Sequence, residues 1–127
     1  MKQLIICSGI FLIMVIGLTG CYRDVILPNA AVDPDGPPQS VSFKTDISPM
    51  VNTKCALAGC HVSGAHKPYM TAGESYQAIV NGGFVNTLIP NQSMIYIKIN
   101  SEMKEFIPSA VDRQKIYDWI RTGALNN

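Results

Sequence analysis

The 127-residue sequence has few of the residues from which many enzyme sites are built. It contains two histidines and one tryptophan, and its nine acidic residues nearly balance its ten lysines and arginines. We find neither a serine–histidine–carboxylate set suited to hydrolysis nor a glycine-rich phosphate-binding motif. The charges also form no basic stripe of the kind that nucleic-acid-binding proteins carry. The sequence therefore gives no support for hydrolysis, phosphate binding or nucleic-acid binding.

Long hydrophobic runs are also scarce, and the one present lies at the N-terminus, over residues 4–18. It is shorter than the ~20 residues that a membrane-spanning helix needs, and it follows Lys2, so it is typical of a signal-peptide core. It leads into Leu18-Thr19-Gly20-Cys21, which resembles a bacterial lipobox. In such signals the peptide is cut before the cysteine, which then carries lipid. We expect residues 1–20 to be a lipoprotein signal peptide and Cys21 to be lipidated; an uncleaved membrane anchor is the alternative.

The next stretch, residues 21–40, looks like a linker. It contains four prolines and three aspartates, and it has few large apolar residues after Leu27. Such a composition buries too little surface to offset its ordering entropy, so we expect a flexible tether. The alternative is an ordered arm around residues 25–27. Residues 41–127 contain no repeat and predict one small domain.

Only two cysteines fall within that domain, Cys55 and Cys60, and His61 follows at once. Two cysteines followed by a histidine attach haem covalently in the C-x-x-C-H motif: the thiols bond to the porphyrin and the histidine binds the iron. Here four residues separate the cysteines. On an undistorted helix positions five apart lie about 140° apart around the axis, so the chain must bulge between them. Gly59 tolerates the backbone angles that a bulge requires.

Three other interpretations of this segment stay open. Cys55 and Cys60 could form a disulfide, as thiols in exported proteins often do. They could bind zinc together with His61 or His66, because closely spaced cysteines and histidines are also zinc ligands. They could also be free, buried thiols.

Helix signals dominate the domain. Thr45 is a candidate N-cap for a first helix that leads to Cys55, with Pro49 tolerated in its first turn. Thr71 and Glu74 form a capping-box pattern before a second helix that ends near Val80. Residues 94–99 alternate like a strand, but Ile95 and Ile99 lie four apart, and we favour a short helix.

The last predicted helix has the clearest pattern. Ser109 is its expected N-cap, and Gly123 follows its end. Its expected inner face consists of Ile116, Trp119 and Ile120, with Trp119 in the core against the first helix. The opposite, charged face consists of Asp112, Lys115, Asp118 and Arg121.

Three segments together resemble small c-type cytochrome domains of exported bacterial lipoproteins: residues 43–49, the C-x4-C-H segment 55–61 and residues 116–124. The longer cysteine spacing is itself similar to that of some multihaem and small c-type cytochromes. The resemblance covers nearly all of residues 41–127. It implies an all-α fold in which one covalent haem c is held between the N- and C-terminal helices through Cys55, Cys60 and His61.

The resemblance also implies a second axial ligand, since methionine opposite histidine is common in electron carriers. Met103 is the first choice because it lies in the loop before the last helix, where the family has its distal methionine. In the family a proline usually follows this methionine, whereas Lys104 follows here. Met94 is the next candidate, and His66 would give a bis-histidine site. Met50 and Met70 are better explained as packing residues.

The sequence thus predicts a membrane-anchored monohaem c-type cytochrome that carries single electrons and is not an enzyme. Its expected partners are redox proteins and, through the anchor, membrane lipid. We expect it in the cell envelope, facing the periplasm or the cell exterior, and the outer membrane is mildly favoured. The main alternative is a haem-free lipoprotein interaction module stapled by a Cys55–Cys60 disulfide.

Overall fold

The computed structural model describes residues 32–127, so the expected signal peptide and Cys21 lie outside the described residues. The described chain forms four α-helices: α2 (Ser48–Lys54), α3 (Ser75–Val80), α4 (Met94–Asn100) and α5 (Ala110–Arg121). A π-helical turn, η1 (Phe43–Ile47), runs into α2, and a 3-10 turn, η2 (Pro90–Gln92), precedes α4. Residues 32–127 contain no strand, which confirms the all-α prediction. Within them, no helix is both long and apolar enough to cross a membrane.

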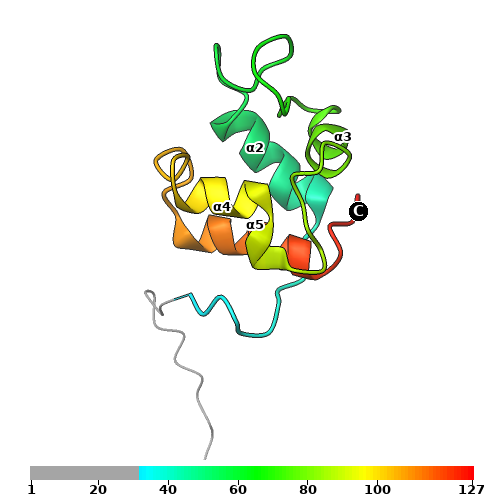
Figure 1. Ribbon diagram of the computed structural model, residues 1–127, viewed down its shortest axis with the longest axis vertical. Coiled ribbons are helices and arrows are strands. Elements are labelled where there is room, and N and C mark those ends of the chain that lie inside the picture. The colour runs from blue at the N-terminus through cyan, green and yellow to red at the C-terminus, as the bar shows by residue number, and fades with distance from the viewer. Residues whose placement is uncertain (1–31) are drawn as a thin grey trace, which may run out of the picture. The chain divides into compact units, whose positions relative to one another are not determined.

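The core lies where η1, α2 and α5 meet, with α4 packed against α5 and α2 in contact with α3 (Figure 1). Trp119 is buried at the centre, and its ring centroid lies 5.2 Å from that of Phe43. Tyr76 meets Phe43 edge to face at 5.0 Å. The prediction that Trp119 is a core residue against the first helix is therefore confirmed.

The first helix begins earlier than predicted. Ser42, rather than Thr45, is its N-cap: the Ser42 hydroxyl accepts a hydrogen bond from the Thr45 N–H (3.3 Å). The Asp46 carboxylate reaches back to accept from the Ser42 N–H (3.0 Å), so two N–H groups at the helix start are satisfied reciprocally. Thr45 therefore lies inside the first turn. The helix ends at Lys54 and leaves Cys55 at its C-cap.

The second predicted helix ends at Val80, as expected, but it begins only at Ser75. The Glu74 carboxylate does not cap it in the predicted way. It accepts hydrogen bonds from the hydroxyls of Thr71 and Ser63 instead, and these two bonds hold the pKa of Glu74 below its usual range. Helix α4 confirms the preference for helix over strand at residues 94–99, because Ile95 and Ile99 share its buried face.

Helix α5 has the predicted Ser109 cap, whose hydroxyl accepts from the Asp112 N–H (3.2 Å). The prediction that Asp118 lies on an exposed charged face is wrong, since only 1% of it is exposed. Its carboxylate accepts from the Gln39 N–H (3.1 Å), from Gln114 Nε2 (2.9 Å) and from the Arg121 guanidinium. These three donors offset the cost of burying the charge.

Burial of Asp118 follows from the chain that covers it. The Arg121 guanidinium also donates to the Gly36 carbonyl (2.9 Å), so residues 36–39 are fixed along α5. By its contacts, the segment from Val32 onward belongs to the same unit as the helices. The described end of the expected flexible linker is therefore an ordered arm, which differs from the prediction for this segment.

Candidate functional site

A cavity of about 410 Å³ opens between the end of α2, the loop that follows it, and α4. Most of its lining is apolar and comes from separate parts of the chain, including Val51, Met70, Phe84, Ile95 and Ile116. Its volume lies within the range typical of cofactor and ligand pockets. The cavity is therefore a candidate binding site.

Cys55, Cys60 and His61 all line this cavity. The loop that carries them is closed on itself: the Cys60 N–H donates to the Leu57 carbonyl (2.9 Å), and the His61 N–H donates to the Cys55 carbonyl (3.2 Å). Gly59 has a φ of +77°, a conformation that side chains with a Cβ rarely adopt. The segment is thus a non-helical bulge with glycine at the turn, as its spacing predicted, and both cysteines reach one cavity.

The two thiols are free, and each is only partly exposed. Burial raises the pKa of Cys55 to about 11; the nearby Cys60 adds to the rise and Lys54 opposes it. A thiol with so high a pKa stays protonated near neutral pH, because a thiolate is poorly solvated in an apolar cavity. Cys55 is therefore a neutral thiol in the structure.

His61 is held by the loop that follows it. Its Nδ1 lies 3.2 Å from the His66 carbonyl oxygen, and the Met70 N–H donates to the His61 carbonyl (2.8 Å). An imidazole that donates from Nδ1 keeps the lone pair of Nε2 free for a metal, and such a bond also fixes the orientation of the ring. His66, predicted as a possible ligand, thus contributes its backbone oxygen here, while most of its side chain is exposed.

The loop from residue 62 to residue 74 is itself tied together at its base. Ser63 bonds to the Thr71 hydroxyl (3.0 Å) and to the Glu74 carboxylate, while the His66 N–H donates to the Cys60 carbonyl (2.9 Å). Hydrogen bonds therefore hold the backbone around His66, whose carbonyl orients the His61 ring.

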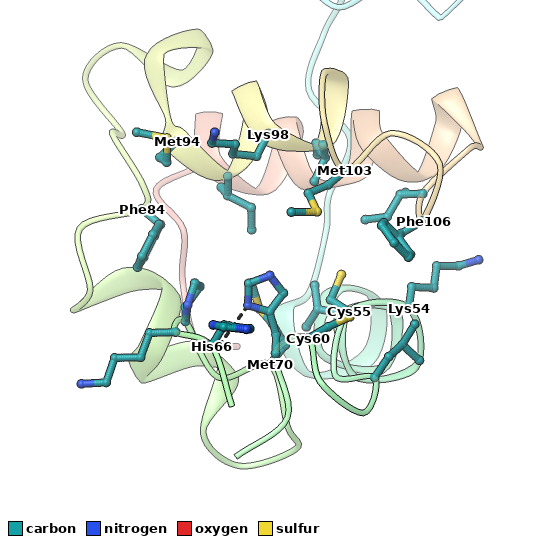
Figure 2. A pocket seen from close by; sticks show the side chains of 18 of the residues that line it. Lys54, Cys55, Cys60, His66, Met70, Phe84, Met94, Lys98, Met103 and Phe106 are labelled. Carbon is teal, nitrogen blue, oxygen red and sulfur yellow. Dashed lines mark hydrogen bonds between the residues drawn. The ribbon is translucent and has the colours of Figure 1, made fainter. Parts of the chain in front are cut away.

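Two methionines occupy the opposite wall. Figure 2 shows Met94 and Met103 on the side of the cavity formed by α4 and the loop after it. The Met103 side chain points toward the side that carries Cys55 and Cys60, whereas the end of the Met94 side chain points away from it. Met103 is 37% exposed and Met94 is 45% exposed. Met70 lines the cavity on the same side as the cysteines, whereas Met50 is not among its lining residues. The structure thus brings both candidate methionine ligands to one cavity with His61.

Sequence reasoning missed the lysines of the site. Lys54, Lys67 and Lys98 all contribute to the cavity lining, and Lys98 pairs with Glu102 at 2.5 Å. They lie on three different segments with no common spacing, so no pattern in the sequence groups them.

The alternative interpretations of the cysteine pair find less support. Within residues 32–127, no three histidine, cysteine, aspartate or glutamate side chains gather closely enough to hold a metal ion, which removes the basis for a zinc site. Cys55 and Cys60 are free rather than joined in a disulfide.

Comparisons of the chain with protein-family models, with curated proteins and with solved structures find no match. The geometry of the cavity and the chemistry of the residues that line it are therefore the basis for inferring its function.

Proposed function

We propose that this protein is a membrane-anchored monohaem c-type cytochrome that carries single electrons. In this proposal haem is attached through Cys55 and Cys60, and His61 is the proximal ligand. The observation that carries the proposal is that both thiols and the imidazole line one apolar cavity, with methionine on the opposite wall.

The cavity suits a covalently attached porphyrin. Its lining is largely apolar, as the faces of the macrocycle require, and the Gly59 bulge brings both thiols to the same cavity. When bound, haem would supply a one-electron iron centre. The chain would position it through Cys55 and Cys60, orient the ligand through the His61–His66 hydrogen bond, and exclude water with residues such as Phe84 and Ile99.

Met103 is the proposed sixth ligand, because it lies across the cavity from the cysteines and histidine–methionine ligation suits an electron carrier. Met94 on the same wall is the alternative. The proposal includes lipidation at Cys21, attachment to a membrane of the cell envelope, preferably the outer membrane, and redox proteins as partners. It assigns no catalytic residue.

The proposal is tested by producing the full chain in cells that export proteins and attach haem, alongside a control cytochrome. We expect c-type absorption bands, a pyridine haemochrome that resists acid–acetone extraction, and a protein mass increased by one haem. Cys55→Ser/Cys60→Ser should abolish covalent attachment, whereas Met50→Leu, outside the cavity, should leave it intact. A colourless protein from cells that load the control would overturn the proposal.

A further inference from the structure

We infer that, before haem is attached, the cavity binds one Cu(I) ion through Cys55 and Cys60, with Met103 as a third ligand. The observation behind this is the concentration of sulfur in one place. Five of the residues that line the cavity carry sulfur: Cys55, Cys60, Met70, Met94 and Met103. The inference concerns the haem-free protein, so Cu(I) binding itself does not depend on the proposed function.

The type of ligand selects the metal. Thiolate and thioether sulfurs favour soft ions such as Cu(I), which accepts both and needs only about two or three ligands. Zinc instead takes about four nitrogen, sulfur or oxygen ligands, and residues 32–127 offer no suitable group of three. Two thiolates and a thioether are therefore the coordination set that this cavity offers.

The loop is shaped to present both thiols at once. The 3.2 Å bond between the His61 N–H and the Cys55 carbonyl closes the segment from 55 to 61, and both cysteines are free. Met103 faces them from the other wall (Figure 2), and its own N–H donates to the Lys98 carbonyl (2.9 Å).

Neighbouring lysines offset part of the cost of the charge that the complex carries. Binding follows Cu⁺ + 2 RSH → [Cu(SR)₂]⁻ + 2 H⁺, with both protons released to solvent and no change in oxidation state, and Met103 adds no charge. The resulting single negative charge lies in a cavity that Lys54 and Lys67 also line. Nearby cations stabilise a partly buried anion, so these lysines lower the cost of forming the complex.

Copper binding and haem attachment would exclude each other, because both use the sulfurs of Cys55 and Cys60. Cu(I) would therefore slow the loading of the newly exported chain. This consequence alone rests on the proposed function.

Copper binding is tested with the full chain carrying Cys7→Ser and Cys21→Ser, purified haem-free in detergent under anaerobic, reducing conditions. Cu(I) is supplied as its coloured bicinchoninate complex, and transfer to the protein is followed by loss of colour. We expect one Cu(I) per chain. Additional Cys55→Ser and Cys60→Ser changes should weaken binding at least about 100-fold, and Met103→Leu about 10-fold. Met50→Leu, a buried methionine outside the cavity, is the matched control and should bind as the parent does.

Copper that stays on the chelator, or that binds equally well without Cys55 and Cys60, would overturn the inference. Equal binding by Met103→Leu and the parent would remove Met103 and overturn the three-sulfur site, even where the serine variants fold poorly. X-ray absorption should show sulfur neighbours, and a predominantly nitrogen shell would also contradict the site. Haem loading is measured separately, so a chain that binds copper but never haem would overturn only the proposed function.

Discussion

At the scale of single residues, the reactivity of the Cys55 thiol is set by its place in the cavity. Its pKa of about 11 in the folded chain lies above the ordinary value of 9.0 because the thiol is buried. At pH 8 its thiolate fraction should therefore be roughly 100-fold smaller than in an unfolded chain. We expect slow alkylation of Cys55 by iodoacetamide in the haem-free protein, and fast alkylation in urea, followed by mass spectrometry of the peptides.

Because the pKa of Cys55 is raised, the stability of the haem-free protein should fall at high pH. Folding of the haem-free protein favours the neutral form of the Cys55 thiol. The resulting contribution to the free energy of unfolding is complete below pH 9 and is lost as the pH rises towards 11. Urea midpoints measured from pH 8 to pH 11 should fall, and the fall should be smaller in Cys55→Ser. Equal alkylation rates in folded and urea-unfolded protein would contradict the buried, neutral thiol.

Met103 carries the second prediction at this scale. In the haem-loaded protein, Met103→Ala should lower the reduction potential and let carbon monoxide bind the reduced iron, because the sixth position loses its thioether. Potentiometry and the carbon monoxide difference spectrum measure both effects. Met94→Ala, on the same wall, is the matched control and should change neither property. The reverse result would assign the ligand to Met94.

At the scale of elements, the least expected feature is the arm over α5. Asp118→Asn should loosen residues 36–39 and lower the free energy of unfolding by about 2 kcal/mol, because a buried set of hydrogen bonds to a charge is weakened. Urea unfolding measures the loss, and limited proteolysis should show new cleavage in the arm. Asp112→Asn makes the same charge change on the partly exposed first turn of α5 and should cost much less. Equal effects would mean that the arm does not depend on Asp118.

The elements that the sequence predicted well are those set by local chemistry. The Ser109 cap, the end of the helix at Val80 and the helical spacing of Ile95 and Ile99 all act within a few residues. The burial of Asp118 could not be read in this way, because its partner Gln39 lies 79 positions away in the chain. A charged residue on an amphipathic helix predicts exposure unless some distant segment covers it.

In the candidate site, too, features set by nearby residues could be predicted from the sequence, whereas others could not. Cys55, Cys60 and His61 were found because their spacing is itself the signal, and the positive φ of Gly59 follows from that spacing. The carbonyl that orients His61 could not be found, since a backbone acceptor leaves no mark in the sequence. Nor does the sequence separate Met94 from Met103, because both belong to the wall formed by α4 and its loop.

At the scale of the whole molecule, the cavity is large for so small a domain. A chain of this size has a modest core, and its open cavity of about 410 Å³ is lined by side chains that would gain contacts from a bound cofactor. We expect the haem-loaded protein to melt at least about 10 °C above the haem-free protein, since the attached haem would bury its apolar faces against the cavity lining only in the folded state. Circular dichroism at 222 nm measures both transitions. Coincident melting curves would mean that the cavity does not receive the cofactor.

The last prediction separates the anchor from the domain. If Cys21 carries lipid, Cys21→Ser should move the protein from the membrane fraction to the soluble fraction, because the acyl chains supply the membrane affinity. The haem spectrum should not change, since the cavity is built wholly from residues 51–116. Cys7→Ser is the matched control: it alters a cysteine of the expected signal peptide and should leave the protein membrane-bound. Cell fractionation with a carbonate wash distinguishes the two variants, and a Cys21→Ser protein that stays in the washed membrane would show that an uncleaved N-terminal segment is the anchor.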